Sequence, residues 1–446
     1  MKAEAEAPVA GATGPALYER AKTLIPGGTQ LLSKRPEMFL PGRWPAYYSR
    51  ARGAEVWDLD GNRYVDMSYS GIGACVLGYA DPDVDAAVIE AVKAGSAATL
   101  NCPEEVELAR VLCEIHPWAQ MARFTRSGGE AMSVAVRIGR ARSRRDRVAF
   151  CGYHGWHDWY ISANLAEDSN LDGHLLPGLE PAGVPRGLRG SSLPFRYNHL
   201  EELERIVREH PGEVGVIVLE PVRNVPPEPG FLEGVRRIAD EIGAVLVVDE
   251  ITTGFRTSTG GVHLQMGLEP DIAVFAKALS NGYAMAAVIG KAQVMSAAQD
   301  TFVSSTSWTE RVGPAAALAT IAKHRAQNVG AHLVHIGRRV RAAWTEAAAE
   351  HGLEVDADGL DPLLHVAIKG PDALAAQTLY HALMLERGFL VGRGFYANFA
   401  HTDAHVDAYA AAVGESFAVI ADARRNGTLE SLLEGPVVHT GFRRLT

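Results

Sequence analysis

The sequence predicts an α/β protein with two domains, a large one built on a mostly parallel β-sheet and a small α+β one. Two observations carry this prediction. Between residues 103 and 290, short apolar runs alternate with helical patterns, as in a buried parallel sheet covered by helices. The last hundred residues combine two strand-like runs with two helical patterns, which is typical of a smaller mixed unit.

The composition of the N-terminal part predicts a tail, followed by a segment that does not form a hydrophobic core of its own. Residues 1–14 are rich in Ala, Glu and Gly, and we expect a disordered tail there. Residues 15–80 mix aromatic residues, prolines and short alternating stretches. The alternation that begins at Ala54 ends in Asp60-Gly61, which is a turn signal for a hairpin. We expect this segment to pack with the small domain.

The large domain is predicted over residues 81–325. Apolar positions recur at helical spacing from Asp81 to Ala94, which indicates an amphipathic helix. Strands of a buried sheet are expected where the chain is briefly apolar and partly β-branched. These runs are 147–151, 214–219, 244–248, 271–275 and 286–289.

The small domain is predicted over residues 326–446, completed by the N-terminal segment. A long helical stretch from Ala315 to about Glu350 is expected to connect it to the sheet domain. Beyond it, the patterns predict strands at 363–368 and 389–391 and helices at 373–387 and 403–425.

Composition and charge exclude several classes of protein. The chain has 446 residues, 47% of them hydrophobic, and a net charge of -10, which argues against binding to nucleic acid or to an anionic membrane. The basic run 137–147 is interpreted as the solvated face of a helix. Because the chain has no signal peptide, no apolar run of about 18 residues and only four scattered cysteines, we expect a cytoplasmic enzyme.

A lysine and an aspartate stand at the ends of neighbouring predicted strands. The apolar run 245–248 ends in Asp249, and 28 residues later Lys277 follows the run 271–275. Ligand sites of open α/β sheets lie at the carboxyl ends of strands. A partly desolvated lysine is a good Schiff-base nucleophile, and a carboxylate keeps the pyridine nitrogen of pyridoxal 5′-phosphate (PLP) protonated. The alternatives are a helix-cap aspartate and a surface lysine.

A glycine turn supplies a candidate phosphate site. In Arg123–Ala131 a short strand runs into Ser127, Gly128 and Gly129 and then into a helix. Glycines let backbone N–H groups approach a phosphate, and a helix start favours an anion. The alternative is a plain turn with Ser127 as helix cap.

The segment Cys151–His157 follows another predicted strand. Its Tyr153 is a flat ring suited to stack on a planar cofactor. The spacing of His154 and His157 also suggests a metal site, but no cluster of further ligand residues accompanies it. We therefore expect no metal.

A series of motifs runs through most of the chain in a fixed order. They are Ile25-Pro-Gly-Gly28, Trp57-Asp-Leu-Asp-Gly61, Val76-Leu-Gly-Tyr-Ala-Asp-Pro82, Ser127-Gly-Gly-Glu-Ala131, Tyr153-His-Gly155, Leu219-Glu-Pro-Val222, Asp249-Glu-Ile-Thr-Thr-Gly-Phe-Arg256, Ala276-Lys-Ala-Leu279, and Thr309 ahead of Gly313-Pro314. Together, over roughly residues 18–425, they resemble the class III, fold-type I PLP-dependent aminotransferases, and within them the branch of glutamate-1-semialdehyde 2,1-aminomutase. The resemblance implies a seven-stranded, mostly parallel sheet in the large domain.

The resemblance also implies roles for individual residues. Lys277 would carry PLP as a Schiff base and move the proton, and Asp249 would bind the pyridine nitrogen. The remaining cofactor contacts that it implies are Tyr153 and Ile251 on the ring faces, Ser127, Gly128 and Gly129 on the phosphate, Glu220 near the ring hydroxyl, and Thr309 from a neighbouring subunit. A homodimer with shared active sites follows from the last contact.

Three departures from the family pattern bear on the substrate side. The family commonly has Thr at the position of Gly129, and the usual small residues around Thr309 are replaced here by larger ones, Trp308 among them. Arg35 is either the partner of a substrate carboxylate or a surface charge. The candidate substrate-binding residues are Arg35, Trp156 and Trp308.

The function expected is transfer of an amino group from an amine donor to a carbonyl acceptor. An aminomutase, an amino-acid epimerase or a decarboxylase would use the same cofactor and remains an alternative. A nicotinamide-dependent oxidoreductase is a remote one, since Gly71-Ile-Gly73 and Gly78 lack the spacing of the dinucleotide fingerprint. A non-catalytic binding protein of the same fold is the last alternative.

Overall fold

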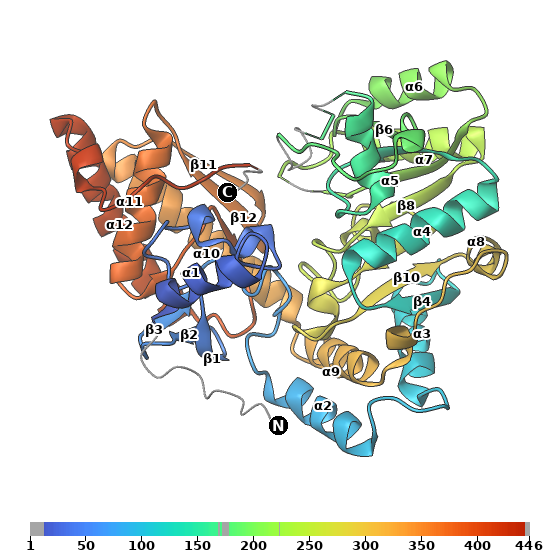
Figure 1. Cartoon of the computed structure of the whole chain (residues 1–446), viewed down its shortest axis with the longest axis horizontal. Helices are drawn as coiled ribbons and strands as arrows, with labels where there is room; N and C mark the ends of the chain where they lie inside the picture. The colour runs from blue at the N-terminus through green and yellow to red at the C-terminus, as the bar shows by residue number, and fades with distance from the viewer. Residues whose placement is uncertain (1–12, 168–169, 172–177, 223, 442–446) are drawn as a thin grey trace.

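The computed structural model describes residues 13–167, 170–171, 178–222 and 224–441. The tail expected over residues 1–14 lies outside this part of the chain except at its end, where Thr13 caps helix α1 (Gly14–Leu24). Figure 1 shows two lobes, one holding the large sheet and the other combining the beginning and the end of the chain.

The large sheet has seven strands in the order β4-β10-β9-β8-β7-β5-β6. Only β10 runs antiparallel to its neighbours, so the expected mostly parallel sheet is confirmed. The strands are β4 (Met121–Thr125), β5 (Arg147–Cys151), β6 (Ser192–Pro194), β7 (Val214–Leu219), β8 (Val245–Asp249), β9 (Ile272–Phe275) and β10 (Ala286–Gly290). Strand β6 was not predicted, because it is only three residues long and ends in a proline, which is tolerated at a sheet edge.

Helices cover both faces of this sheet, which explains why its strands are apolar throughout. Val216 and Val218 of β7 pack on the side of helix α4, whereas Ile217 and Leu219 pack on the opposite side. Successive strand residues point to opposite faces, so both sets need apolar side chains. The helices of this lobe are α2 (Pro82–Ala94), α3 (Pro103–Ile115), α4 (Gly128–Ser143), α5 (Asp158–Ile161), α6 (Leu200–Glu209), α7 (Phe231–Ile242), α8 (Ala292–Met295) and α9 (Val312–Ala326).

The second lobe joins the two ends of the described chain in one sheet. The predicted hairpin forms as β2 and β3, and β3 pairs in parallel with β13 near the C-terminus. A three-stranded sheet and three long helices complete the lobe. Its elements are β1 (Tyr48–Arg52), β2 (Glu55–Asp58), β3 (Arg63–Asp66), α10 (Val329–His351), β11 (Val355–Leu360), β12 (Leu363–Ile368), α11 (Ala373–Glu386), β13 (Phe389–Leu390), β14 (Gly394–Tyr396) and α12 (Asp403–Asn426).

The connecting stretch is two helices rather than the single one expected over 315–350. Helix α9 ends at Ala326 and α10 begins at Val329, with Asn328 between them at φ 47°. Asparagine is one of the few residues that adopts this left-handed conformation readily. A Cβ on Gly330 would come within 2.6 Å of the Thr257 backbone, so the start of α10 is packed too tightly for a straight continuation.

Two further expectations concern segments outside the sheets. The glycines Gly71, Gly73 and Gly78 all have positive φ and lie in turns between β3 and α2, so they do not form the strand-to-helix junction of a dinucleotide site. Among the described residues, no helix is long and apolar enough to cross a membrane.

Candidate active site

A cavity of about 360 Å³ opens beside the carboxyl ends of β8 and β9. It brings together most of the residues that the sequence singled out. The predicted residues that line it are Ser127, Gly128, Gly129, Tyr153, Trp156, Asp249, Ile251 and Lys277.

Asp249 is the last residue of β8, and its side chain is fixed by two contacts. It is 2% exposed. Oδ1 accepts a hydrogen bond of 3.0 Å from the backbone N–H of Ile251, and Oδ2 lies 2.8 Å from Nδ1 of His154. The other ring nitrogen of His154 lies 3.1 Å from the carbonyl of Cys151. Because a carbonyl only accepts, Nε2 of His154 is assigned as the donor in this contact, and the ring is held between the ends of β5 and β8.

Lys277 follows β9 and begins a short 3₁₀ helix, Lys277–Ser280. Its backbone has φ 48°, a left-handed conformation that strains a residue with a side chain. Its Nζ donates a hydrogen bond of 2.8 Å to Oγ1 of Thr252. In the sheet, Asp249 pairs with Val274 of the neighbouring strand, so the carboxylate and the amine leave adjacent strand ends.

The turn between β4 and α4 presents unused backbone donors to the cavity. Glu130 accepts from the N–H groups of Arg126 and Ser127, at 3.1 Å each. In the part of the chain that the structure describes, the N–H groups of Gly128 and Gly129 have no acceptor. A helix start with free donors and a favourable dipole holds an anion such as phosphate.

The first glycine of this turn is also required by packing. A Cβ on Gly128 would lie 2.9 Å from Cδ1 of Ile251, which is closer than carbon atoms pack. Gly128 in the phosphate turn is therefore in direct contact with Ile251, which follows Asp249 and Glu250.

Tyr153 lines the cavity, whereas Glu220 lies behind it. Glu220 is 6% exposed, and its Oε2 accepts a hydrogen bond of 3.0 Å from the backbone N–H of Tyr153. Gly152 has φ 113°, and a Cβ there would lie 2.6 Å from the same carboxylate oxygen. The structure thus has Glu220 supporting the loop of Tyr153 and not lining the cavity.

Three other predicted residues lie outside the cavity of their own chain. The guanidinium of Arg35 packs against Gly27, where a Cβ would lie 2.7 Å from one of its nitrogens. Trp308 is half-buried, and its carbonyl accepts a hydrogen bond of 3.0 Å from Arg126. Thr309 is exposed, and its hydroxyl donates 2.9 Å to the carbonyl of Thr306.

The sequence reasoning did not assign roles to three residues that the structure connects to the site. Thr252 holds the amine of Lys277, and His154 holds Asp249. Arg126 lines the cavity and is bonded to the carbonyl of Glu310 at 2.7 Å. Each of the three adjoins or lies within a motif already singled out. The motifs therefore indicated the right segments, but they did not show which side chains contact each other.

The metal alternative has no support in the described part of the chain. Both nitrogens of His154 face Asp249 and Cys151. The described residues contain no group of three or more His, Cys, Asp or Glu placed to hold a metal ion.

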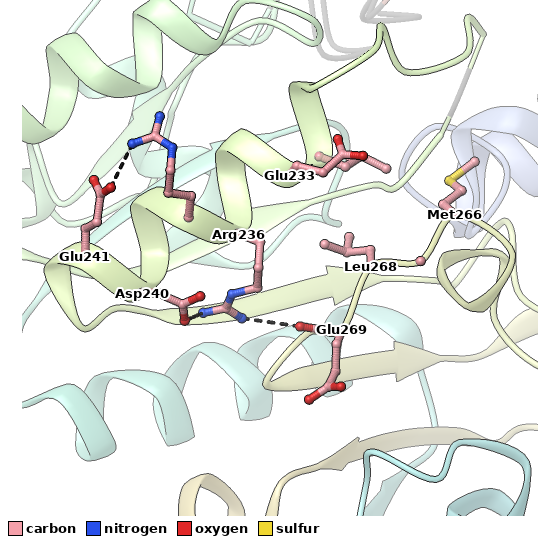
Figure 2. Close-up of a pocket in the computed structure, with 10 residues that line it drawn as sticks. Glu233, Arg236, Asp240, Glu241, Met266, Leu268 and Glu269 are labelled. Atoms are coloured by element: carbon pink, nitrogen blue, oxygen red, sulfur yellow. Dashed lines mark hydrogen bonds and ion pairs between the residues drawn. The ribbon is translucent and has the colours of Figure 1, made fainter.

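A second hollow of about 440 Å³ lies along the outer side of α7 (Figure 2). Its arginines are neutralised by neighbouring acids: Arg236 contacts Asp240 at 2.6 Å, and Arg237 contacts Glu241 at 2.8 Å. None of its lining residues lines the first cavity. With its charges satisfied at the surface, this hollow offers no grouping suited to catalysis.

Comparisons with known proteins agree with this geometry. Residues 41–361 match the family described as aminotransferase class-III. Glutamate-1-semialdehyde 2,1-aminomutase of Roseiflexus castenholzii (strain DSM 13941 / HLO8) is 34% identical over 435 residues, covering 92% of this chain and 98% of that protein. 3-aminobutyryl-CoA aminotransferase of Cloacimonas acidaminovorans (strain Evry) is 30% identical over 417 residues, covering 91% of this chain and 96% of that protein.

The fold comparison reaches the same conclusion. The solved structure of the PLP internal aldimine form of the FumI protein of Sphingopyxis sp. MTA144 has a TM-score of 0.84 and 26% identity, covering 93% of this chain and 98% of that chain. The expected fold-type I transferase fold is therefore confirmed. The chain belongs to the class III aminotransferases and uses PLP as its cofactor.

Proposed function

We propose that Lys277 binds PLP covalently and that the enzyme moves an amino group from an amine donor to a carbonyl acceptor. One observation supports this above all: an amine, the buried carboxylate of Asp249 and the free N–H groups of Gly128 and Gly129 line a single cavity. PLP carries an aldehyde, a pyridine nitrogen and a phosphate, so the cavity offers one suitable group to each.

Asp249 is proposed to hold the proton of the pyridine nitrogen. When bound, PLP draws electrons away from the substrate carbon, and a protonated ring nitrogen strengthens this pull. A carboxylate next to that nitrogen favours its charged form. The contact of Oδ2 with His154 supports the role, because it fixes the orientation of the carboxylate.

Lys277 is proposed to act a second time, as the group that moves a proton. With the cofactor and an amine substrate bound, Nζ would be the base that takes up a proton at the substrate carbon and returns it. Thr252, whose hydroxyl accepts from Nζ at 2.8 Å, is proposed to hold the amine on that side of the cavity.

The ring and phosphate of the cofactor have proposed partners as well. Tyr153 and Ile251 line the cavity with apolar surface and are suited to pack on the ring. Ser127, Gly128 and Gly129 are proposed to hold the phosphate. Glu220 is proposed to act through the backbone of Tyr153, whose N–H it accepts.

We propose a homodimer in which Thr309 reaches the phosphate of the neighbouring subunit. Thr309 is exposed and does not line the cavity of its own chain. Large apolar side chains exposed on the described surface support an interface: Phe302 is 85%, Leu100 82% and Trp156 71% exposed. Mixing a Thr309→Ala chain with a Lys277→Ala chain should restore activity in one of the two sites of each heterodimer if the active sites are shared.

The direct test of the function uses the yellow holoenzyme. Borohydride should trap a pyridoxyl group on Lys277, and Lys277→Ala should lose both the visible absorbance band and turnover. Asp249→Asn should lose at least about 100-fold in kcat, because an amide does not keep the ring nitrogen protonated. Turnover by Lys277→Ala with added PLP, or near-normal rates in Asp249→Asn, would contradict the proposal.

An aminomutase is the second candidate, favoured by the 34% identity to glutamate-1-semialdehyde 2,1-aminomutase. The two functions differ in products. An aminotransferase releases one keto product for each amine consumed and needs an acceptor, whereas an aminomutase returns an isomer of its substrate without one. A panel of amines with and without acceptor, followed by product identification, separates them.

A cytoplasmic location is proposed as well. Among the described residues, Cys75, Cys102, Cys113 and Cys151 form no disulfide, as is usual in a reducing compartment. Fractionation of cells that express the natural chain tests this directly.

A further inference from the structure

The loop after β5 folds back onto the first turn of α4. A Cβ on Gly129 would lie 3.0 Å from Cδ2 and 3.2 Å from Nε2 of His157. A Cβ on Gly155 would lie 3.3 Å from Cα of Gly129. The imidazole edge therefore occupies the space in which a side chain at position 129 would stand.

The ring nitrogen at this edge has no partner. Nε2 of His157 is shielded from solvent, and no hydrogen-bonding group among the described residues pairs with it. A buried polar atom without a partner costs free energy, and such groups in native proteins usually have a ligand or a water to satisfy them. Burial also lowers the pKa of His157, against the opposing charges of Glu130 and Asp158, so the ring is neutral at pH 7 and has one N–H to donate.

The backbone carbonyl of His157 has a separate role in starting a helix. Its carbonyl accepts from the N–H groups of Tyr160 and Ile161, at 2.9 and 3.1 Å, and this starts helix α5. The side chain makes no capping bond there. The position of the ring against Gly129 is thus not needed to build the helix.

We propose that His157 donates its Nε2–H to the phosphate of PLP, as a side-chain partner to the free N–H groups of Gly128 and Gly129. This inference rests on the proposed phosphate site at the start of α4. The imidazole edge of His157 adjoins Gly129, at the rim of the cavity and not in its lining. A phosphate bound at the start of α4 would therefore have this side-chain N–H available beside the two backbone N–H groups. Gly129 is then required because any side chain would push the donor away.

The test compares two cofactor forms on the apoenzyme, PLP and pyridoxal, which lacks the phosphate. His157→Ala should weaken PLP binding about 10- to 100-fold, as expected for loss of a hydrogen bond to a charged group. Pyridoxal binding should change less than about 2-fold, by the same reasoning. The ³¹P NMR signal of bound PLP should also shift, which a purely structural role would not produce.

Matched variants keep the result interpretable if the alanine variant folds poorly. His157→Gln places an amide N–H near the position of Nε2 and should retain PLP affinity, whereas the shorter His157→Asn should lose it. Gly129→Ala should lose affinity to the same degree, and combining it with His157→Ala should add nothing further. Trp156→Phe removes the indole N–H near the same glycine, 3.6 Å from its Cβ position, and should leave the ratio of PLP to pyridoxal affinity unchanged.

Two results would overturn the inference. One is a ratio of PLP to pyridoxal affinity that stays unchanged in His157→Ala, and the other is a fall of that ratio in Trp156→Phe instead. Failure of the proposed function looks different, because borohydride would then trap no adduct on Lys277 even in the unaltered protein. Normal trapping together with an unchanged ratio refutes the role of His157 alone.

Discussion

His154 and Asp249 form a buried pair in which Nδ1 lies 2.8 Å from Oδ2. The histidine ring is 1% exposed and stacks on Trp159 with 6.2 Å between ring centroids. The aspartate proposed to face the cofactor is thus held from behind by a second titratable group. Since a hydrogen bond to a charged group contributes about 1.5–3 kcal/mol, loss of the histidine is expected to weaken the positioning of Asp249 at the cofactor.

His154→Asn should bind PLP nearly normally but turn over about 10- to 100-fold more slowly, because Asp249 loses the group that fixes the orientation of its carboxylate. The measurement is kcat together with the ¹⁵N NMR shift of PLP labelled at the pyridine nitrogen. The labelled nitrogen should lose its proton at a lower pH than in the unaltered enzyme. An unchanged shift would show that Asp249 needs no support.

Thr252→Val should slow the reaction of the apoenzyme with PLP about 10-fold, because Nζ of Lys277 loses its hydrogen-bond partner and samples more rotamers. Stopped-flow absorbance at the band of the bound cofactor measures this rate. Thr252→Ser keeps the hydroxyl and serves as the control. Equal rates in the valine and serine variants would argue that the hydroxyl has no part in holding the amine.

Gly152→Ala should destabilise the protein by at least about 2 kcal/mol, since φ 113° strains any side chain and its Cβ would meet the carboxylate of Glu220. Gly212→Ala is the matched control: its φ is 75°, and a Cβ there meets nothing within 4 Å. The control should cost only about 1 kcal/mol of conformational strain. Thermal melting of the two variants measures the loss of stability in each. Similar losses would mean that the side chain of Glu220 moves away from the new Cβ at little cost.

Four buried histidines predict a loss of stability in mild acid. Burial lowers the pKa of His116, His324, His381 and His401 to about 4, against 6.5 in the unfolded chain. Between these values the unfolded state binds more protons, so stability rises with pH and is lost as pH falls from about 6.5 to 4. Each histidine contributes at most about 3 kcal/mol.

The melting temperature of the protein between pH 7.5 and 4.5 measures this effect. His324→Gln should flatten the profile, because glutamine does not titrate. Thr320→Val, at a buried residue one helical turn before His324 in α9, removes no titrating group and should leave the slope of the profile unchanged. A profile equally steep in both variants would count against the histidines as its cause.

The sheet was predictable because both of its faces are covered. Val216, Ile217 and Val218 are all fully buried, so the strand is a continuous apolar run, and the same is true of its neighbours. The direction of β10 was not predictable, since an apolar run has no polarity of its own. The break at Asn328 was missed for a related reason: it depends on the contact of Gly330 with Thr257, which is distant in sequence.

In the active site, the sequence identified the residues at the ends of strands, Asp249 and Lys277. The structure added the residues that hydrogen-bond to them, His154 and Thr252. Asp249 and Lys277 follow apolar runs and could be found by position alone. The partnership of His154 with Asp249 joins two strand ends that are almost a hundred residues apart, and no periodicity reports it. The place of Glu220 behind Tyr153 depends likewise on a loop closure by Gly152.

The parallel pairing of β3 with β13 joins Val65 to Phe389. In Figure 1 the left-hand lobe combines blue elements from the beginning of the chain with orange and red elements from its end. On the ribosome, the first strands therefore emerge long before their neighbour does, while every strand of the seven-stranded sheet has been synthesised by Gly290. The half that bears Lys277 can fold during translation, whereas the lobe that contains the β3–β13 pair waits for the end of synthesis. A nascent chain stalled near residue 350 would thus present an assembled seven-stranded sheet before β3 has its partner strand.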